Sequence, residues 1–189
     1  MNALDPTAQA LLQSVVDTAR AIFGAAASSI FLLDEAAGEL VFQAVSGAGE
    51  DSLVGTRFPA GRGIAGWVAS TGEPMVVDDL TTDGAFARDL AEATAYVPDA
   101  LMAAPLLDAS GVLGVLEVLD PAPQARASLG ELDLLALFAR QAATALRAVL
   151  DLRALRSASP RPPLARLDPA DRAAGLRTLD ALRELLLAH

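Results

Sequence analysis

A stretch rich in glycine and proline, residues 57–80 (RFPAGRGIAGWVASTGEPMVVDDL), constrains the fold of this chain more than any other segment. Glycine tolerates positive φ and close backbone approach, and three glycines stand where an extended segment must turn and start a helix, namely Gly61, Gly63 and Gly66. Gly72 is placed to end this helix and Pro74 prevents its continuation, so the helix must be short. The apolar residues 75–77 then predict a buried strand.

The glycines of residues 61–66 also match the fingerprint of a dinucleotide-binding site. That site needs a parallel crossover of a dozen or more residues, whereas only about eight separate Gly66 from Pro74. Pro59 interrupts the preceding extended segment, which argues against a central parallel strand there. The sequence therefore does not favour a nucleotide-dependent oxidoreductase.

Two long amphipathic helices are predicted near the ends of the domain. The first begins at Pro6 with Asp5 as its cap, and its apolar residues recur at helical spacing: Ala8, Leu11, Leu12, Val15, Val16, Ala19, Ile22 and Phe23. The second is predicted at residues 132–156, with one apolar stripe made by Leu132, Leu135, Ala139, Ala142, Leu146 and Val149. Further apolar residues lie on its other faces, namely Leu134, Leu137, Phe138, Ala145 and Leu152. This helix has more apolar surface than its own sheet can cover.

Two β-hairpins are predicted between these helices. Their strands are expected at residues 29–33, 39–45, 101–107 and 112–119. Residues 46–55 are predicted to form a loop, and residues 81–98 a turn followed by a short helix that carries Phe86. Because the strands of the second hairpin are apolar on both faces, helices should cover the antiparallel sheet above and below.

The predicted fold class is therefore α+β, with a central antiparallel sheet and helices on both faces. One domain is expected at residues 4–156, a proline-rich linker at 157–167 and a C-terminal amphipathic helix at 168–189. The mixed leucine spacing of the last helix leaves open whether it pairs across a dimer or folds back on its own domain.

Composition excludes several kinds of chemistry. The chain has no cysteine, which removes disulfides, thiolate metal sites and cysteine nucleophiles, and its single histidine is the terminal His189. Haem ligation and histidine acid–base catalysis are therefore unsupported, and we expect no cofactor and no metal site. Three acidic residues are expected to form turns at the end of a strand instead of holding a metal, namely Asp78, Asp79 and Asp83.

The charge pattern and hydropathy limit the partners. Residues 1–139 hold 19 acidic and 5 basic side chains (net −14), and residues 140–189 hold 5 acidic and 9 basic side chains (net +4). The acidic body repels nucleic acid, and the interspersed arginines of the tail are interpreted as solvated helix faces. No apolar run reaches the ~18 residues of a membrane span, and the N-terminus lacks a secretory signal pattern. We expect a cytoplasmic protein with no membrane or nucleic-acid partner.

Several segments together resemble the GAF domain, a small sensory module of many bacterial and eukaryotic signalling proteins. The resembling residues are Phe58-Pro59, 61–68, Glu73-Pro74, 76–78, Asp83, Phe86, Arg88, 103–106 and 114–117. The resemblance covers most of residues 4–152 and nothing after, and it points to a small stand-alone sensor of the bacterial type. It implies terminal helices on one face of the sheet and a ligand layer on the other.

The resemblance implies that a small ligand lies between the sheet and the helices and loops over it. The residues expected to bind this ligand are Phe58, Arg62, Ile64, Trp67, Phe86, Tyr96, Met102 and Glu117. Arg62 is either an exposed loop residue or a contact for an anionic ligand group. Glu117 is a lone charge on an apolar strand, so it needs a partner or a wet cavity and faces either the pocket or a sheet edge.

The sequence departs from particular branches of this family. Cyclic-nucleotide-binding members carry an Asn-Lys, Phe, Asp-Glu signature after the last strand, and this chain has Asp120-Pro121, Ala127 and Glu131-Leu132 there. The lack of cysteine argues against the methionine-sulfoxide reductase and bilin-linking branches. We therefore expect no catalytic activity. The predicted function is sensing of an unknown small molecule, reported through terminal helices in a homodimer to a downstream signalling protein; the alternative is a ligand-free scaffold for dimerisation and partner docking.

Overall fold

A computed structural model describes residues 6–48, 50–81, 87, 89, 92, 96–123, 129–158 and 174–177. The chain divides into two units, Met1–Leu152 and Arg153–His189. The first unit contains the sheet and the helices that cover it. In the second unit, residues 174–177 are helical, and the rest of the predicted C-terminal helix lies outside the described residues. The predicted linker and the domain boundaries stay predictions.

Six antiparallel strands form one sheet in the order β3-β2-β1-β6-β5-β4. The strands are β1 (Ala27–Asp34), β2 (Glu39–Gly47), β3 (Arg57–Pro59), β4 (Met75–Val77), β5 (Leu101–Asp108) and β6 (Gly111–Leu119). Both predicted hairpins are confirmed, as β1–β2 and β5–β6. They join at the centre, where β1 pairs with β6 and Ser29 lies opposite Glu117.

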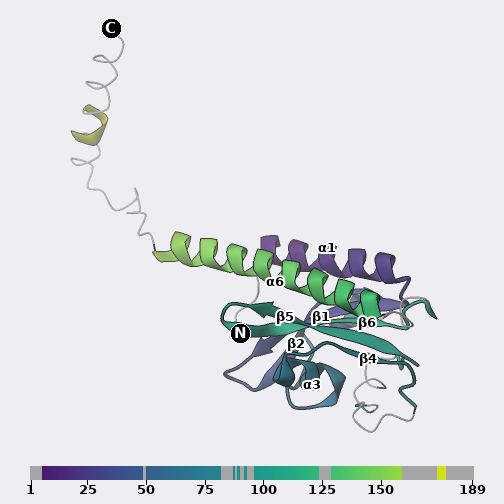
Figure 1. Cartoon of the computed structure of the whole chain (residues 1–189). Helices are drawn as coiled ribbons and strands as arrows, with labels where there is room; N and C mark the ends of the chain where they lie inside the picture. Colours follow the sequence, from purple (N-terminus) through teal and green to yellow (C-terminus); the bar gives the residue numbers. More distant parts are fainter. Residues whose placement is uncertain are drawn as a thin grey trace. The chain divides into compact units, whose positions relative to one another are not determined.

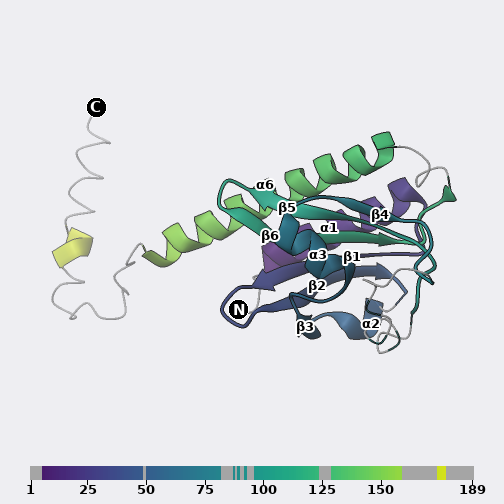
Figure 2. The ribbon, with the colours of Figure 1, turned by 60° about the horizontal axis from the view of Figure 1, so that its bottom comes forward.

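Helices cover both faces of this sheet, which confirms the predicted fold class. α1 (Pro6–Phe23) and α6 (Leu129–Ala158) lie on one face, and α3 (Gly63–Thr71) lies on the other (Figures 1 and 2). A further helical turn, α2 (Glu50–Leu53), lies in the segment predicted to be a loop, which corrects that prediction. Its Leu53 is only 9% exposed, and burial of this side chain supplies the stabilisation that local sequence does not indicate.

The two sheet faces have separate hydrophobic cores. The core under α1 and α6 includes Leu12, Val16, Phe23, Met102, Leu116, Leu135 and Leu146. The core on the other face includes Phe31, Leu40, Phe42, Ile64, Val68, Leu101 and Val115. Strands β1, β5 and β6 supply residues to both cores, which explains why these strands do not alternate between apolar and polar residues.

The glycine-rich stretch forms the predicted turn and short helix. Gly72 ends α3 with φ of 71°, and its N–H donates to the carbonyl of Val68 at 2.9 Å. Gly66 cannot carry a side chain, because a Cβ there would lie 2.5 Å from the carbonyl oxygen of Ala60. The strands before and after α3, β3 and β4, lie at opposite edges of the sheet, so they form no parallel crossover around this helix. A dinucleotide-binding site of the kind that the glycine fingerprint suggests is therefore excluded here.

Other details differ from the sequence-based expectations. β4 is an edge strand whose residues are only partly buried, whereas a buried strand was expected. Ile22 on α1 is 52% exposed, although it was expected on the apolar face of the helix.

The Asp5 cap and most of residues 81–98, including Phe86, lie outside the described residues. No helix in the described ranges is long and apolar enough to cross a membrane.

Candidate ligand-binding pocket

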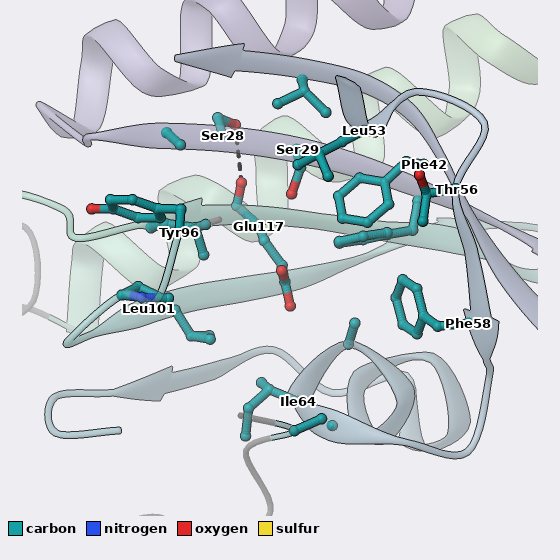
Figure 3. Close-up of a pocket in the computed structure, with 18 of the residues that line it drawn as sticks. Ser28, Ser29, Phe42, Leu53, Thr56, Phe58, Ile64, Tyr96, Leu101 and Glu117 are labelled. Atoms are coloured by element: carbon teal, nitrogen blue, oxygen red, sulfur yellow. Dashed lines mark hydrogen bonds between the residues drawn. The ribbon is translucent and has the colours of Figure 1, made fainter. Parts of the chain in front are cut away.

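A cavity of about 390 Å³ opens on the sheet face that α3 covers. Its walls come from β1, β2 and β6, from the start of α3, and from residues near Tyr96 (Figure 3). The volume lies within the range of small-molecule sites, which are concave and mostly apolar with a few polar groups. The first turn of α3 contributes Ile64 and Ala65, because Gly63 with φ of 71° turns the chain into the helix directly above the sheet.

Three phenylalanines form one wall of the pocket. The ring centroid of Phe31 lies 4.4 Å from that of Phe42 and 5.2 Å from that of Phe58. The rings of Phe31 and Phe58 meet edge-to-face, with an angle of 86° between their planes. The Phe42 and Phe58 rings are 5.9 Å apart. Such tilted contacts are the favourable arrangement for aromatic rings. The cluster gives the pocket a fixed apolar surface.

Glu117 on β6 faces this pocket and not a sheet edge. The residue is 7% exposed, and its side chain points from the strand into the cavity (Figure 3). Burial raises the pKa of Glu117 to about 7 from its usual 4.5. The hydroxyl of Ser28 donates to the backbone carbonyl of Glu117 at 2.9 Å, not to its carboxylate. Within the described part of the chain, no side chain pairs with this carboxylate.

Two arginines at the pocket are already paired with protein carboxylates. Nη2 of Arg62 lies 2.8 and 3.1 Å from the two carboxylate oxygens of Asp89. Nη1 of Arg57 lies 2.8 Å from Glu39 and 3.1 Å from Asp34. Both arginine residues line the pocket, and the charges of their guanidinium groups are balanced by protein carboxylates.

Tyr96 closes one side of the pocket through contacts with Asp120. Its hydroxyl donates to Oδ2 of Asp120, whose Oδ1 accepts from the N–H groups of Asp99 and Ala100, each at 2.9 Å. Burial, with the hydrogen bond and charge of Asp120, raises the pKa of Tyr96 to about 12. Asp120, the residue after β6, thus holds the segment between Tyr96 and β5 in place.

A family model for the GAF domain matches residues 7–146 of this sequence. The chain belongs to the GAF domain family. Solved GAF domains have the same fold. The GAF domain of a phosphoenolpyruvate-protein phosphotransferase from Coxiella burnetii is 22% identical with a TM-score of 0.70, covering 79% of this chain and 88% of that chain. The corresponding Acinetobacter domain is 19% identical with a TM-score of 0.66, covering 77% of this chain and 85% of that chain.

A curated relative matches in sequence. The "Probable 3',5'-cyclic phosphodiesterase pde-5" of Caenorhabditis elegans is 28% identical over 120 residues, which is 59% of this chain. The chain spans only 16% of the length of that relative.

Five of the residues expected at the GAF-domain ligand site line the cavity: Phe58, Arg62, Ile64, Tyr96 and Glu117. Trp67 does not line the pocket, which corrects the expectation; it is 39% exposed, because Ile64, Ala65 and Val68 are the α3 residues that face the sheet. The expectation was also wrong for Met102, which does not line the pocket. It is fully buried under α1 and α6, because adjacent residues of a strand point to opposite faces and Leu101 faces the pocket.

Phe31 and Phe42 were missed as residues of the GAF-domain pocket. Alternation along the first hairpin could have indicated them, because Ser29 and Phe31 share one face of β1. The expected turn-forming role of the acidic residues is confirmed for Asp79, whose Oδ1 accepts from the N–H of Thr81 at 2.8 Å. Within the described residues, no group of histidine, aspartate and glutamate side chains is arranged to hold a metal ion.

Proposed function

We propose that this GAF domain is a sensory module that binds a small molecule in the pocket and passes the bound state on through α1 and α6. The observation that carries the proposal is the preformed cavity of about 390 Å³, which has an aromatic wall and a buried carboxylate. A domain that served only as a scaffold would gain stability by filling this space with side chains. The cytoplasm is the proposed setting.

The central strands provide a physical route from the pocket to the helices. On β1, Phe31 faces the pocket and its neighbour Ile30 packs in the core under α1 and α6. On β6, Glu117 faces the pocket and Leu116 packs in the helix-side core. A ligand that favours one position of these strands would therefore change the packing of α1 and α6, as a shift in population between two states.

The proposed signalling unit is a homodimer joined through the terminal helices. On α6, Leu134 is 42% exposed and Leu137 is 59% exposed. Phe138, which was expected beside them, is partly buried against the helix-side core and does not belong to this exposed surface. Burying the two leucines against the same helix of a second copy would remove apolar surface from water.

No catalytic activity is proposed for this domain. The described residues that line the pocket include one carboxylate and several hydroxyl groups, but no histidine or cysteine. Nucleophilic and acid–base catalysis need a nucleophile with a positioned base, and this set of residues offers no such pair. The ligand is therefore expected to leave the protein unchanged.

Native mass spectrometry of freshly purified protein tests the proposal. A dimer that carries retained non-protein mass, lost on mild activation, is the expected result. A dimer without bound mass, combined with no thermal shift across a metabolite library, would favour the alternative of a ligand-free scaffold. Turnover of any library compound by the pure protein would contradict the non-catalytic role.

A further inference from the structure

The pocket contains the carboxylate of Glu117, which faces the cavity and pairs with no side chain among the described residues. Glu117 is 7% exposed and reaches into the cavity, while the hydrogen bond from Ser28 goes to its backbone carbonyl (Figure 3). Removing a carboxylate from water is costly unless it receives hydrogen bonds or an opposite charge. A ligand group that donates hydrogen bonds to this carboxylate would supply what the protein does not.

The positively charged side chains among the described residues that line the pocket do not change this requirement. Arg62 is bound to Asp89 and Arg57 to both Asp34 and Glu39, so neither guanidinium is left to balance Glu117. An anionic ligand would meet the charge of Glu117 and would have to compete with protein carboxylates for each arginine. The charge distribution therefore favours a cation or a neutral hydrogen-bond donor over an anion.

The aromatic wall indicates the rest of the ligand. Phe31, Phe42 and Phe58 present ring faces and edges to the cavity, and such rings favour the packing of a flat aromatic body. Ring faces also attract cations. Ser29, opposite Glu117 on β1, adds a hydroxyl on the same side of the sheet. Apolar packing and one nitrogen-to-carboxylate contact can thus be satisfied together.

We propose that the ligand is a small aromatic or heteroaromatic molecule with a cationic or N–H-donating nitrogen group. Its nitrogen donates to the carboxylate of Glu117, and its ring packs against the cluster of Phe31, Phe42 and Phe58. This inference rests on the proposed sensory function and names the ligand class for the same pocket.

Three fragments of matched shape test the ligand class, namely benzamidine, benzamide and benzoate, which are cationic, neutral and anionic. Each is titrated at about pH 8, above the pKa of about 7 of Glu117, so that the carboxylate is charged. The protein is ¹⁵N-labelled and full-length, and binding is followed through the amide resonances of residues that line the pocket. Benzamidine is expected to bind at least about tenfold more tightly than benzoate, with benzamide between them, because one charge-assisted hydrogen bond contributes roughly this factor.

The variant Glu117→Gln keeps the side-chain shape and removes the charge. It should lose the preference for benzamidine over benzoate, whereas the control Glu73→Gln, at an exposed glutamate after α3, should keep it. The ranking in the unmodified protein tests the inference even if Glu117→Gln folds poorly. A preference that persists in folded Glu117→Gln would overturn the assignment to this residue.

Two results separate this inference from the proposed function. If benzoate binds as tightly as benzamidine, the ligand class is wrong, although the pocket still binds small molecules and the sensory proposal stands. If no fragment shifts the pocket resonances at millimolar concentration, the ligand class is also wrong. The sensory proposal is then decided separately by the mass retained on the native protein.

Discussion

Arg147 of α6 donates from its Nε to Oδ2 of Asp108 at 2.5 Å, which ties this helix to the turn between β5 and β6. Ser110 completes the contact. Its N–H and hydroxyl donate to Oδ1 of Asp108 at 2.7 and 2.6 Å, and its oxygen accepts from Nη2 of Arg147 at 2.7 Å. Because the strand that leaves this turn carries Glu117, one hairpin connects the pocket with α6.

Asp108→Asn is expected to lower the free energy of unfolding at neutral pH and to reduce its dependence on acid. Hydrogen bonds from Ser110 and Arg147 lower the pKa of Asp108 to about 2 from its usual 3.8. A lowered carboxyl pKa stabilises the fold above the unfolded pKa, and this stabilisation is lost as pH falls through about 2. Urea unfolding at pH values from neutral down to about 2 measures the free energy of unfolding of both proteins. The control is Asp133→Asn, an exposed residue of α6; the same acid dependence in both variants would contradict the role of Asp108.

Glu117→Gln is expected to raise the free energy of unfolding above pH ~7 while changing it little near pH ~4. Burial raises the pKa of Glu117 to about 7 from its usual 4.5, so between these two pH values the folded protein keeps a proton that the unfolded chain has released. The unmodified protein should therefore lose about 3 kcal/mol of stability as pH rises across this interval. Arg57, Arg62 and Tyr96 also line the pocket, but each is paired with a carboxylate.

Urea unfolding of ligand-free protein as a function of pH measures this effect. Glu73→Gln serves as the control, because this exposed glutamate lies outside the pocket. A pH profile of Glu117→Gln that matches the unmodified protein would show that the carboxylate is not buried in solution.

Phe31→Ala is expected to cost more stability than Trp67→Ala, although tryptophan is the larger residue. Phe31 is 3% exposed and contacts two other rings, so its truncation should cost about 3–5 kcal/mol. Trp67 is 39% exposed, and its removal should cost about 1–2 kcal/mol. Urea unfolding followed by far-ultraviolet circular dichroism compares them. Equal losses, or a blue-shifted Trp67 emission in the native protein, would place Trp67 in the core.

Leu134→Glu combined with Leu137→Glu is expected to convert the proposed homodimer into a folded monomer. Both side chains are exposed on α6, and two buried charges would oppose association strongly. Sedimentation at micromolar concentration measures the change. The control Val54→Glu alters an apolar side chain that is 50% exposed and lies before β3, so it should leave the dimer intact. Truncation after Ser157 should also preserve it. A monomeric parent protein would defeat the proposal.

Local chemistry in the sequence was sufficient to predict the two long helices, the short helix α3 and both hairpins of this fold. Pro6, Gly72 and Pro74 mark helix and strand boundaries through backbone geometry that needs no tertiary contact. The hairpins were predicted from apolar runs joined by short turns, and the glycine-rich stretch carried the resemblance to the GAF family that the comparison confirmed. Glu117 was recognised because a single charge in an apolar strand requires an explanation.

Only the tertiary structure decided which side chains meet at the pocket. β5 and β6 are apolar on both faces, so alternation could not tell that Met102 faces the helices while Glu117 faces the cavity. Trp67 is exposed and Phe31 is buried because α3 packs on one particular face of the sheet. The position of α3 depends on contacts between segments that lie far apart in the sequence. The pairing of Arg62 with Asp89 likewise joins residues 27 positions apart, which local patterns do not encode.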